Sequence, residues 1–197
     1  ADDVWVVGAR DTLGPTVLHW NGESWRRRIL DGEGAEQVDL WWGHALPDGE
    51  VLLSGGDGAL FSGGVDRPFR RQSTRSLARQ TVFGVWSDPS TGRAYAVGGI
   101  GARSGFVWER EPGSDTWRPL PLPAQMPKLV NGAHAGIFKV WGDGEGRVWF
   151  VGASGTALVR EGGQPLELIE TPTTQTLFTV AYDPSGDRAI AVGGGSA

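Results

Sequence analysis

The chain has 197 residues, of which 39% are hydrophobic and 21% charged, so it has enough apolar side chains to bury a core. A net charge of −5 opposes a nucleic-acid role, and the absence of cysteine excludes disulfides and thiolate chemistry. No apolar stretch approaches the roughly 20 residues that span a bilayer. The 32 glycines and 10 tryptophans are typical of short strands joined by tight turns, and they predict an all-β fold.

In chain order, the predicted elements repeat a unit of four strands, A to D. Strand A runs into a turn rich in Gly, Pro and Asp, strand B ends on a glycine, and strand D opens on a bulky apolar residue. The chain supplies B, C and D, then three complete units, then A and B. The segments are 38–50, 82–93, 137–147 and 177–188 for strand A with its turn; 5–8, 52–55, 95–98, 149–152 and 190–193 for strand B; 16–20, 59–62, 105–109 and 156–160 for strand C; and strands beginning at Trp25, Phe69, Trp117 and Leu166 for strand D.

The glycines that end strand B recur every 41 to 54 residues, around the roughly 40 to 50 residues of one β-propeller blade. Stacking such sheets against one another buries apolar faces that a single sheet would expose to solvent. A β-sandwich would also contain short strands and turns, but it would not need a repeated unit. We therefore predict a β-propeller of four-stranded antiparallel blades, about four to five in this chain, as a single domain over residues 1–197. It is either a fragment of a larger propeller or a chain that another copy completes. The blade segments are about 1–30, 31–75, 76–122, 123–172 and 173–197.

The bulky residues of these units are predicted to fill the space between blades. Asp88, Asp143 and Asp183 occupy equivalent turns after strand A, where an aspartate accepts hydrogen bonds from amides two residues on. We place His44 at the same turn position in the second unit. The predicted core residues are Trp5, Leu52, Tyr95, Trp149 and Ile190 on strand B, and Trp42, Trp86, Trp141 and Ala181 at one shared position of strand A.

The segments VWVVGA followed by TVLHWNGESW, and VWGDGEGRVWFVGASGTALVRE, resemble bacterial kelch-like and galactose-oxidase-like propeller repeats and those of extracellular sensor kinases. This resemblance covers essentially the whole chain. It implies a bacterial binding protein that is secreted or periplasmic, and hence an extracellular or periplasmic location. The WD dipeptide of WD repeats is missing, and the copper ligands of galactose oxidase have no counterparts, since Tyr95 and Tyr182 both lie inside the repeated unit.

Residues with catalytic or metal-binding chemistry are scattered. His19, His44 and His134 share no metal-ligand spacing, and we find no nucleophile elbow, phosphate loop or carboxylate pair. The sequence therefore predicts no cofactor, no metal and no catalytic residue, and a protein that is not an enzyme.

Function in a propeller usually depends on the longer loops. Connections B-to-C and D-to-A emerge on one face, and the long ones cover 9–15, 99–104 and 119–135. Their cations favour a polar or anionic ligand, so we predict a binding or protein-interaction scaffold with a protein or glycan partner. A carbohydrate-binding, lectin-like propeller is the alternative, and a propeller lyase or glycosidase is a third. The candidate ligand-binding residues at this rim are Arg10, Asp11, Arg103, Lys128, Asn131 and His134.

Overall fold

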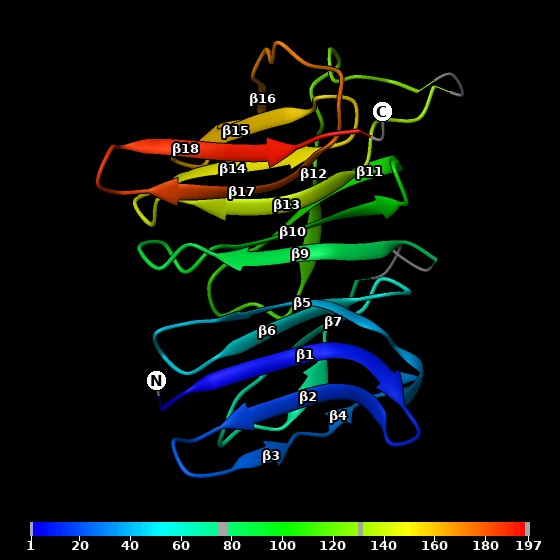
Figure 1. Ribbon diagram of the computed structural model, residues 1–197, viewed down its shortest axis with the longest axis vertical. Coiled ribbons are helices and arrows are strands. Elements are labelled where there is room, and N and C mark those ends of the chain that lie inside the picture. The colour runs from blue at the N-terminus through cyan, green and yellow to red at the C-terminus, as the bar shows by residue number, and fades with distance from the viewer. Residues whose placement is uncertain (1, 75–78, 130–131, 196–197) are drawn as a thin grey trace.

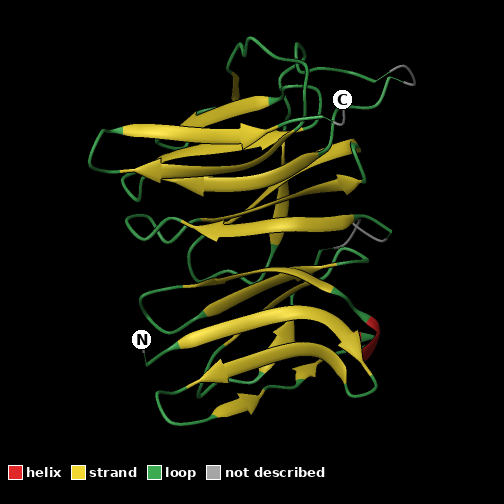
Figure 2. Cartoon of the chain, in the orientation of Figure 1, coloured by secondary structure: helices red, strands yellow, loops and turns green. Residues whose placement is uncertain are grey.

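A computed structural model describes residues 2–74, 79–129 and 132–195, which form antiparallel sheets that follow one another from one end of the molecule to the other (Figures 1 and 2). We number the sheets as blades 1 to 5. Blade 1 contains β1 (Val4–Asp11), β2 (Gly14–Trp20) and β3 (Trp25–Arg27); blade 2 contains β5 (Leu40–Ala45), β6 (Val51–Gly55), β7 (Leu60–Gly63) and β8 (Phe69–Arg71), with β4 (Leu30–Asp31) added parallel to β8; blade 3 contains β9 (Thr81–Ser87), β10 (Ala94–Ile100), β11 (Arg103–Arg110) and β12 (Trp117–Leu120); blade 4 contains β13 (Ile137–Gly142), β14 (Arg147–Gly152), β15 (Ala157–Glu161) and β16 (Glu167–Leu168); blade 5 contains β17 (Leu177–Asp183) and β18 (Arg188–Gly193).

This order confirms the predicted propeller blades. Apart from β4, neighbouring strands within each blade are joined in sequence order, and the first strands β5, β9, β13 and β17 pack against one another in turn. We call these four the inner strands, because the first strand of a blade lies nearest the axis of a propeller. Blades 1 and 5 lie at opposite ends of the stack (Figure 1). Ala35–Gln37 form a short 3-10 turn, and no helix in the described part of the chain is long and apolar enough to cross a membrane.

The core lies between the blades. One buried cluster joins Val17 of blade 1 to Phe61 of blade 2, and a second joins Leu52 of blade 2 to Val85 of blade 3. A third joins blade 3 to Phe150 of blade 4. Burial of side chains from adjacent sheets therefore holds the stack together, as the repeat predicts for blades 1 to 4. The prediction is wrong for Ile190 and Ala181 of blade 5, which are exposed.

Strand pairing corrects one predicted alignment. Trp42 lies opposite Ser54, whereas Trp86 lies opposite Tyr95, so the position equivalent to Trp86 in blade 2 is His44, which faces Leu52. The turn position that we assigned to His44 belongs to Leu46, whose amide donates to the Glu50 carbonyl. The aspartate turns are confirmed. Oδ1 of Asp88, Asp143 and Asp183 accepts from the amide two residues on, at 2.8, 2.7 and 3.0 Å.

Buried ion pairs join neighbouring blades at a repeated position. Arg110 at the end of β11 binds Glu50 of blade 2, at 2.9 Å from Nη1 to Oε1 and 3.0 Å from Nη2 to Oε2. Arg160, which opposes Val148 of β14 as Arg110 opposes Ala94 of β10, binds Glu109 of blade 3. One arginine near the end of the third strand thus reaches back to a carboxylate of the preceding blade, in blade 3 and again in blade 4.

Candidate binding site on the inner strands and the adjoining rim

Two of the six candidate rim residues lie on blade 1 and are engaged in ion pairs. The backbone amide of Arg10 donates to Oδ1 of Asp39 at 2.9 Å, and its guanidinium donates to the Gln37 carbonyl. Asp11 accepts from Nη1 and Nη2 of Arg27 at 2.7 and 2.9 Å, and this interaction lowers the pKa of the Asp11 carboxyl. Arg10 and Asp11 therefore hold the end of β1 in place.

Three other candidates lie together between blades 3 and 4. Arg103 forms a backbone bridge to Ala135, and Lys128 forms one to His134. The Gly136 amide donates to the Ala102 carbonyl at 2.8 Å, so the β10–β11 turn is bonded to the segment that enters β13. Among the described residues Arg103 and Lys128 are exposed and form no ion pair, while Nδ1 of His134 is buried without a hydrogen-bond partner. Asn131 lies outside the described residues.

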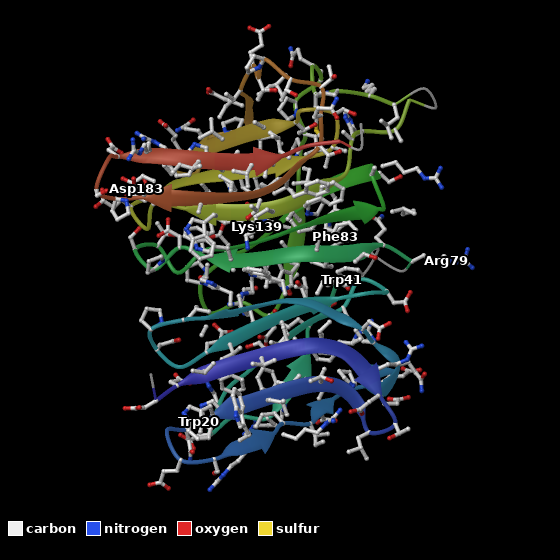
Figure 3. All side chains as sticks on the ribbon, viewed as in Figure 1. Trp20, Trp41, Arg79, Phe83, Lys139 and Asp183 are labelled. Atoms are coloured by element: carbon white, nitrogen blue, oxygen red, sulfur yellow. The ribbon has the colours of Figure 1, made fainter. Side chains whose placement is uncertain are left out.

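A row of aromatic side chains runs along the inner strands, and we call it the aromatic row. Each inner strand contains a β-bulge directly after the residue that faces the glycine ending the second strand. The bulged residue is aromatic every time. Successive ring centroids are 5.8, 5.2 and 6.2 Å apart. The row consists of Trp41, Phe83, Phe138 and Phe178, and Figure 3 labels its first two members.

The aromatic row is covered in the middle and open at its ends. Trp41 and Phe178 are each 58% exposed, whereas Phe83 and Phe138 are half-buried between their neighbours. An exposed aromatic strip on the inner strands is available to a ligand. The strip is not among the residues predicted from the sequence, although an aliphatic residue followed by an aromatic one recurs at this place, in Leu40-Trp41, Val82-Phe83, Ile137-Phe138 and Leu177-Phe178.

Lys139, labelled in Figure 3, directly follows Phe138 of the row on β13 and places its charge on two other aromatic rings. Its Nζ is 2.9 Å from the centroid of the Trp42 ring and 5.4 Å from that of Trp141. Lys139 belongs to blade 4 and Trp42 to blade 2, so the lysine side chain reaches across blade 3, where Gly84 of β9 lies against the Lys139 backbone. Burial lowers the Lys139 pKa to about 8, and burial also lowers the pKa of His44, with a further contribution from the Lys139 charge.

A cavity of about 520 Å³ opens between β1 and β5. Trp5, Trp41 and Trp42 form apolar walls, and Asp3 and His44 provide polar groups at its edge. No group of three or more His, Cys, Asp or Glu side chains in the described ranges is placed to hold a metal ion.

No protein-family model matches the sequence, and no curated protein matches it either. Solved structures do match, and they are β-propellers. The structure of YCF48 bound to a D1 peptide aligns with a TM-score of 0.64 at 14% identity, over 98% of this chain and 57% of that one. The chain has a β-propeller fold.

Other matched structures carry different functions on the same fold. A luciferin-regenerating enzyme aligns with a TM-score of 0.62 at 16% identity, over 98% of this chain and 71% of that one. The extracellular domain of a one-component system, BT4673 from B. thetaiotaomicron, aligns with a TM-score of 0.53 at 12% identity, over 97% of this chain and 31% of that one. The chain spans less than two thirds of the YCF48 structure, so these likenesses show the fold alone.

Proposed function

We propose that this chain is a non-catalytic binding module that takes an extended segment of a protein partner along the aromatic row and the rim beside it. The observation that carries the proposal is the exposed aromatic row, whose strand β13 begins directly after the segment bonded to the turn of Arg103. Phe138 follows Gly136 by two residues, and Gly136 is bonded to the turn that presents Arg103. Aromatic rings and arginine are the side chains most enriched at binding hot spots.

The charges favour a partner with acidic side chains between apolar ones. Arg103 and Lys128 have no acidic partner among the described residues, whereas Arg10 is already held by Asp39. An acidic segment would gain attraction at the first two residues and little at Arg10. We therefore assign ligand contact to Arg103, Lys128 and His134, and a supporting role to Arg10 and Asp11.

The non-catalytic assignment rests on the ionisable groups of the inner strands. Asp39, directly before β5, binds Arg10, and Lys139 lies over Trp42, so each of these two groups already has a partner within the chain. The YCF48 structure with its bound peptide supports a protein partner, and the extracellular domain among the matched structures supports an extracellular location. The luciferin-regenerating enzyme shows why the assignment needs an experiment, because its fold is the same.

A paired screen tests the proposal. The chain is applied to a peptide display library biased towards alternating acidic and aromatic residues and, in parallel, to a glycan array. We expect peptide binders, and a double variant Arg103→Ala/Lys128→Ala should bind them at least about tenfold more weakly. Arg26→Ala/Arg70→Ala removes the same charge from two exposed side chains on β3 and β8 and is the matched control.

Glycan binders without peptide binders would replace the proposal with the lectin-like alternative. Equal losses in the two double variants would show that net charge, and not the rim, governs binding.

A further inference from the structure

Blade 3 contains a cleft of about 390 Å³, which is within the range of ligand pockets. Its walls include Phe106 and Trp108 of β11 and Pro119 of β12. Two polar residues also line it: Gln80, directly before β9, and His134, three residues before β13. Blade 3 lies between blades 2 and 4, each of which contains its own four strands, so complete blades bound the cleft.

The backbone around the cleft is held in place on both sides. The carbonyl of Gln80 accepts from the Gly58 amide at 2.7 Å, and that of His134 accepts from the Gly105 amide at 3.2 Å. Met126 is buried in the core between blades 3 and 4, and it anchors the loop that leads to His134. The cleft is therefore preformed, which spares a ligand the cost of ordering its walls.

The two polar side chains of the cleft lack partners. Gln80 and His134 are half-buried, and neither side chain forms a hydrogen bond within the described part of the chain. Oε1 of Gln80 and Nδ1 of His134 are closed off from solvent, whereas Nε2 of each is accessible. A half-turn of the amide exchanges Oε1 and Nε2 of Gln80, and the ring proton of His134 can lie on either nitrogen, so each side chain can offer a donor or an acceptor. Because buried polar groups are normally hydrogen-bonded, two unsatisfied ones in one cleft indicate that a ligand supplies the missing bonds.

The walls and the polar pair together define the group that fits. The aromatic and proline walls favour a ring, which packs against them face to face or edge to face. A phenol adds a polar tip that does both jobs: its oxygen accepts from Nε2 of Gln80, and its hydroxyl donates to the unprotonated Nε2 of His134. A phenyl ring would leave both groups unsatisfied, an indole N–H would satisfy one of them, and a carboxylate would not cover the apolar walls.

We propose that this cleft takes a tyrosine side chain of the protein partner as its anchor. The inference rests on the proposed function and deepens it, because it names one residue of the segment that crosses the rim. Ser104 and Gly105 line the cleft and directly follow Arg103, so a bound segment can place a tyrosine in the cleft and an acidic side chain at Arg103. Tyrosine is among the side chains that most often act as anchors in protein interfaces.

Titration of the 197-residue chain with N-acetyl-tyrosinamide and N-acetyl-phenylalaninamide, followed by nuclear magnetic resonance, tests the cleft. The two probes are uncharged and differ by one hydroxyl group. We expect the tyrosine probe to bind at least about tenfold more tightly, because only its hydroxyl satisfies Gln80 and His134. It should also shift the indole N–H signal of Trp108 and the backbone amide signals of residues 104–108 and 132–134.

Gln80→Met separates the hydrogen bond from the packing of the ring. It keeps the length of the side chain and removes its polar atoms, so affinity for the tyrosine probe should fall about tenfold while affinity for the phenylalanine probe stays unchanged. Gln175→Met is the matched control. The carbonyl of the exposed Gln175 accepts from the Gly155 amide at 2.8 Å, at the place between blades 4 and 5 that is equivalent to that of Gln80 and Gly58 between blades 2 and 3. This variant should bind both probes as the parent does.

Three results would overturn the tyrosine anchor. They are equal affinity for the two probes, signal shifts confined to residues outside the cleft, and equal losses in Gln80→Met and Gln175→Met.

Failure of the anchor and failure of the proposed function are distinguishable. The probes carry no charge, so Arg103→Ala/Lys128→Ala should bind the tyrosine probe as the parent does while it loses affinity for acidic peptides. If peptides selected by the parent chain kept their affinity after every tyrosine was changed to phenylalanine, the anchor would be refuted and the proposed function would stand.

Discussion

Glu50→Gln tests whether buried ion pairs hold the blades together. Arg110 donates two hydrogen bonds to Glu50, and their side chains are only 6% and 14% exposed. Ser62 donates a third, from its hydroxyl to Oε1 of Glu50 at 2.5 Å. The substitution keeps the size of the side chain and removes its charge. Arg110 is then a buried cation without a counterion.

Removing one partner of a buried ion pair costs about 3–5 kcal/mol, and the retained amide places Glu50→Gln near 3 kcal/mol. The effect depends on pH. Burial raises the pKa of Glu50, but the hydrogen bonds and charge of Arg110 and the hydroxyl of Ser62 outweigh it and hold this pKa below its ordinary value of 4.5. A carboxyl with a lowered pKa stabilises the folded state above its ordinary pKa, and the contribution disappears as the pH falls through the lowered value.

Urea denaturation from neutral to acidic pH measures this difference. Glu161→Gln is the matched control, because Glu161 pairs with Arg147 at 2.8 Å while their side chains are 61% and 44% exposed. Such a surface pair contributes less than about 1 kcal/mol. If Glu50→Gln lost no more than Glu161→Gln at pH 7, or if its deficit persisted unchanged in acid, the ion pair would not be the link between blades 2 and 3.

Three further changes probe the packing of the blades. Burial of the Lys139 ammonium lowers its pKa to about 8 and destabilises the fold while the group is protonated, so the parent chain should become more stable between pH 8 and the ordinary lysine pKa of 10.5. Lys139→Met should lack this rise, and urea midpoints across the range measure it. Gly55→Ala should cost about 1–3 kcal/mol because its Cβ meets the Asp39 carbonyl at 2.5 Å, whereas Gly8→Ala should stay within about 0.5 kcal/mol, as thermal melting would show. Asp143→Ala should lose about 1 kcal/mol in chemical denaturation, because its carboxylate accepts from two backbone amides of the turn.

The strand order was predictable because it depends on a local pattern that repeats. Each unit has period-2 alternation, a turn with its own chemistry and a terminal glycine, and these need no knowledge of neighbouring blades. The register of Trp42 was predicted wrongly for a physical reason. Matching Val38 to Val82 shifts blade 2 by two residues, because Leu40 is the residue that faces Gly55 as Val82 faces Gly98. A shift of two residues keeps the same period-2 alternation, so the pattern within one strand does not reveal it.

The candidate rim was predictable only as a set of loops. Long loops on one face identify residues such as Arg10 and Arg103 as near one edge, but not which of them has a partner. That depends on contacts between segments distant in sequence: Asp39 meets Arg10 across 29 residues, and nothing acidic meets Arg103 in the described structure. Such ion pairs depend on how the blades are placed relative to one another, and the alternation of residues within one strand gives no information about that placement.

The aromatic row follows from a property of the bulge itself. In a regular inner strand, side chains alternate between the two adjacent blades, so every large side chain packs into the core on one side or the other. A change of aromatic ring to suit a ligand would then disturb that packing. An extra, unpaired residue removes this conflict, because the residues before and after it keep their partners. In β9, Val82 still faces Gly98 and Gly84 still faces Val97, while Phe83 is free to contact its counterparts in the next blades. The row can therefore change residue by residue without altering the register of any blade, which is the freedom that a binding surface needs on a repeated scaffold.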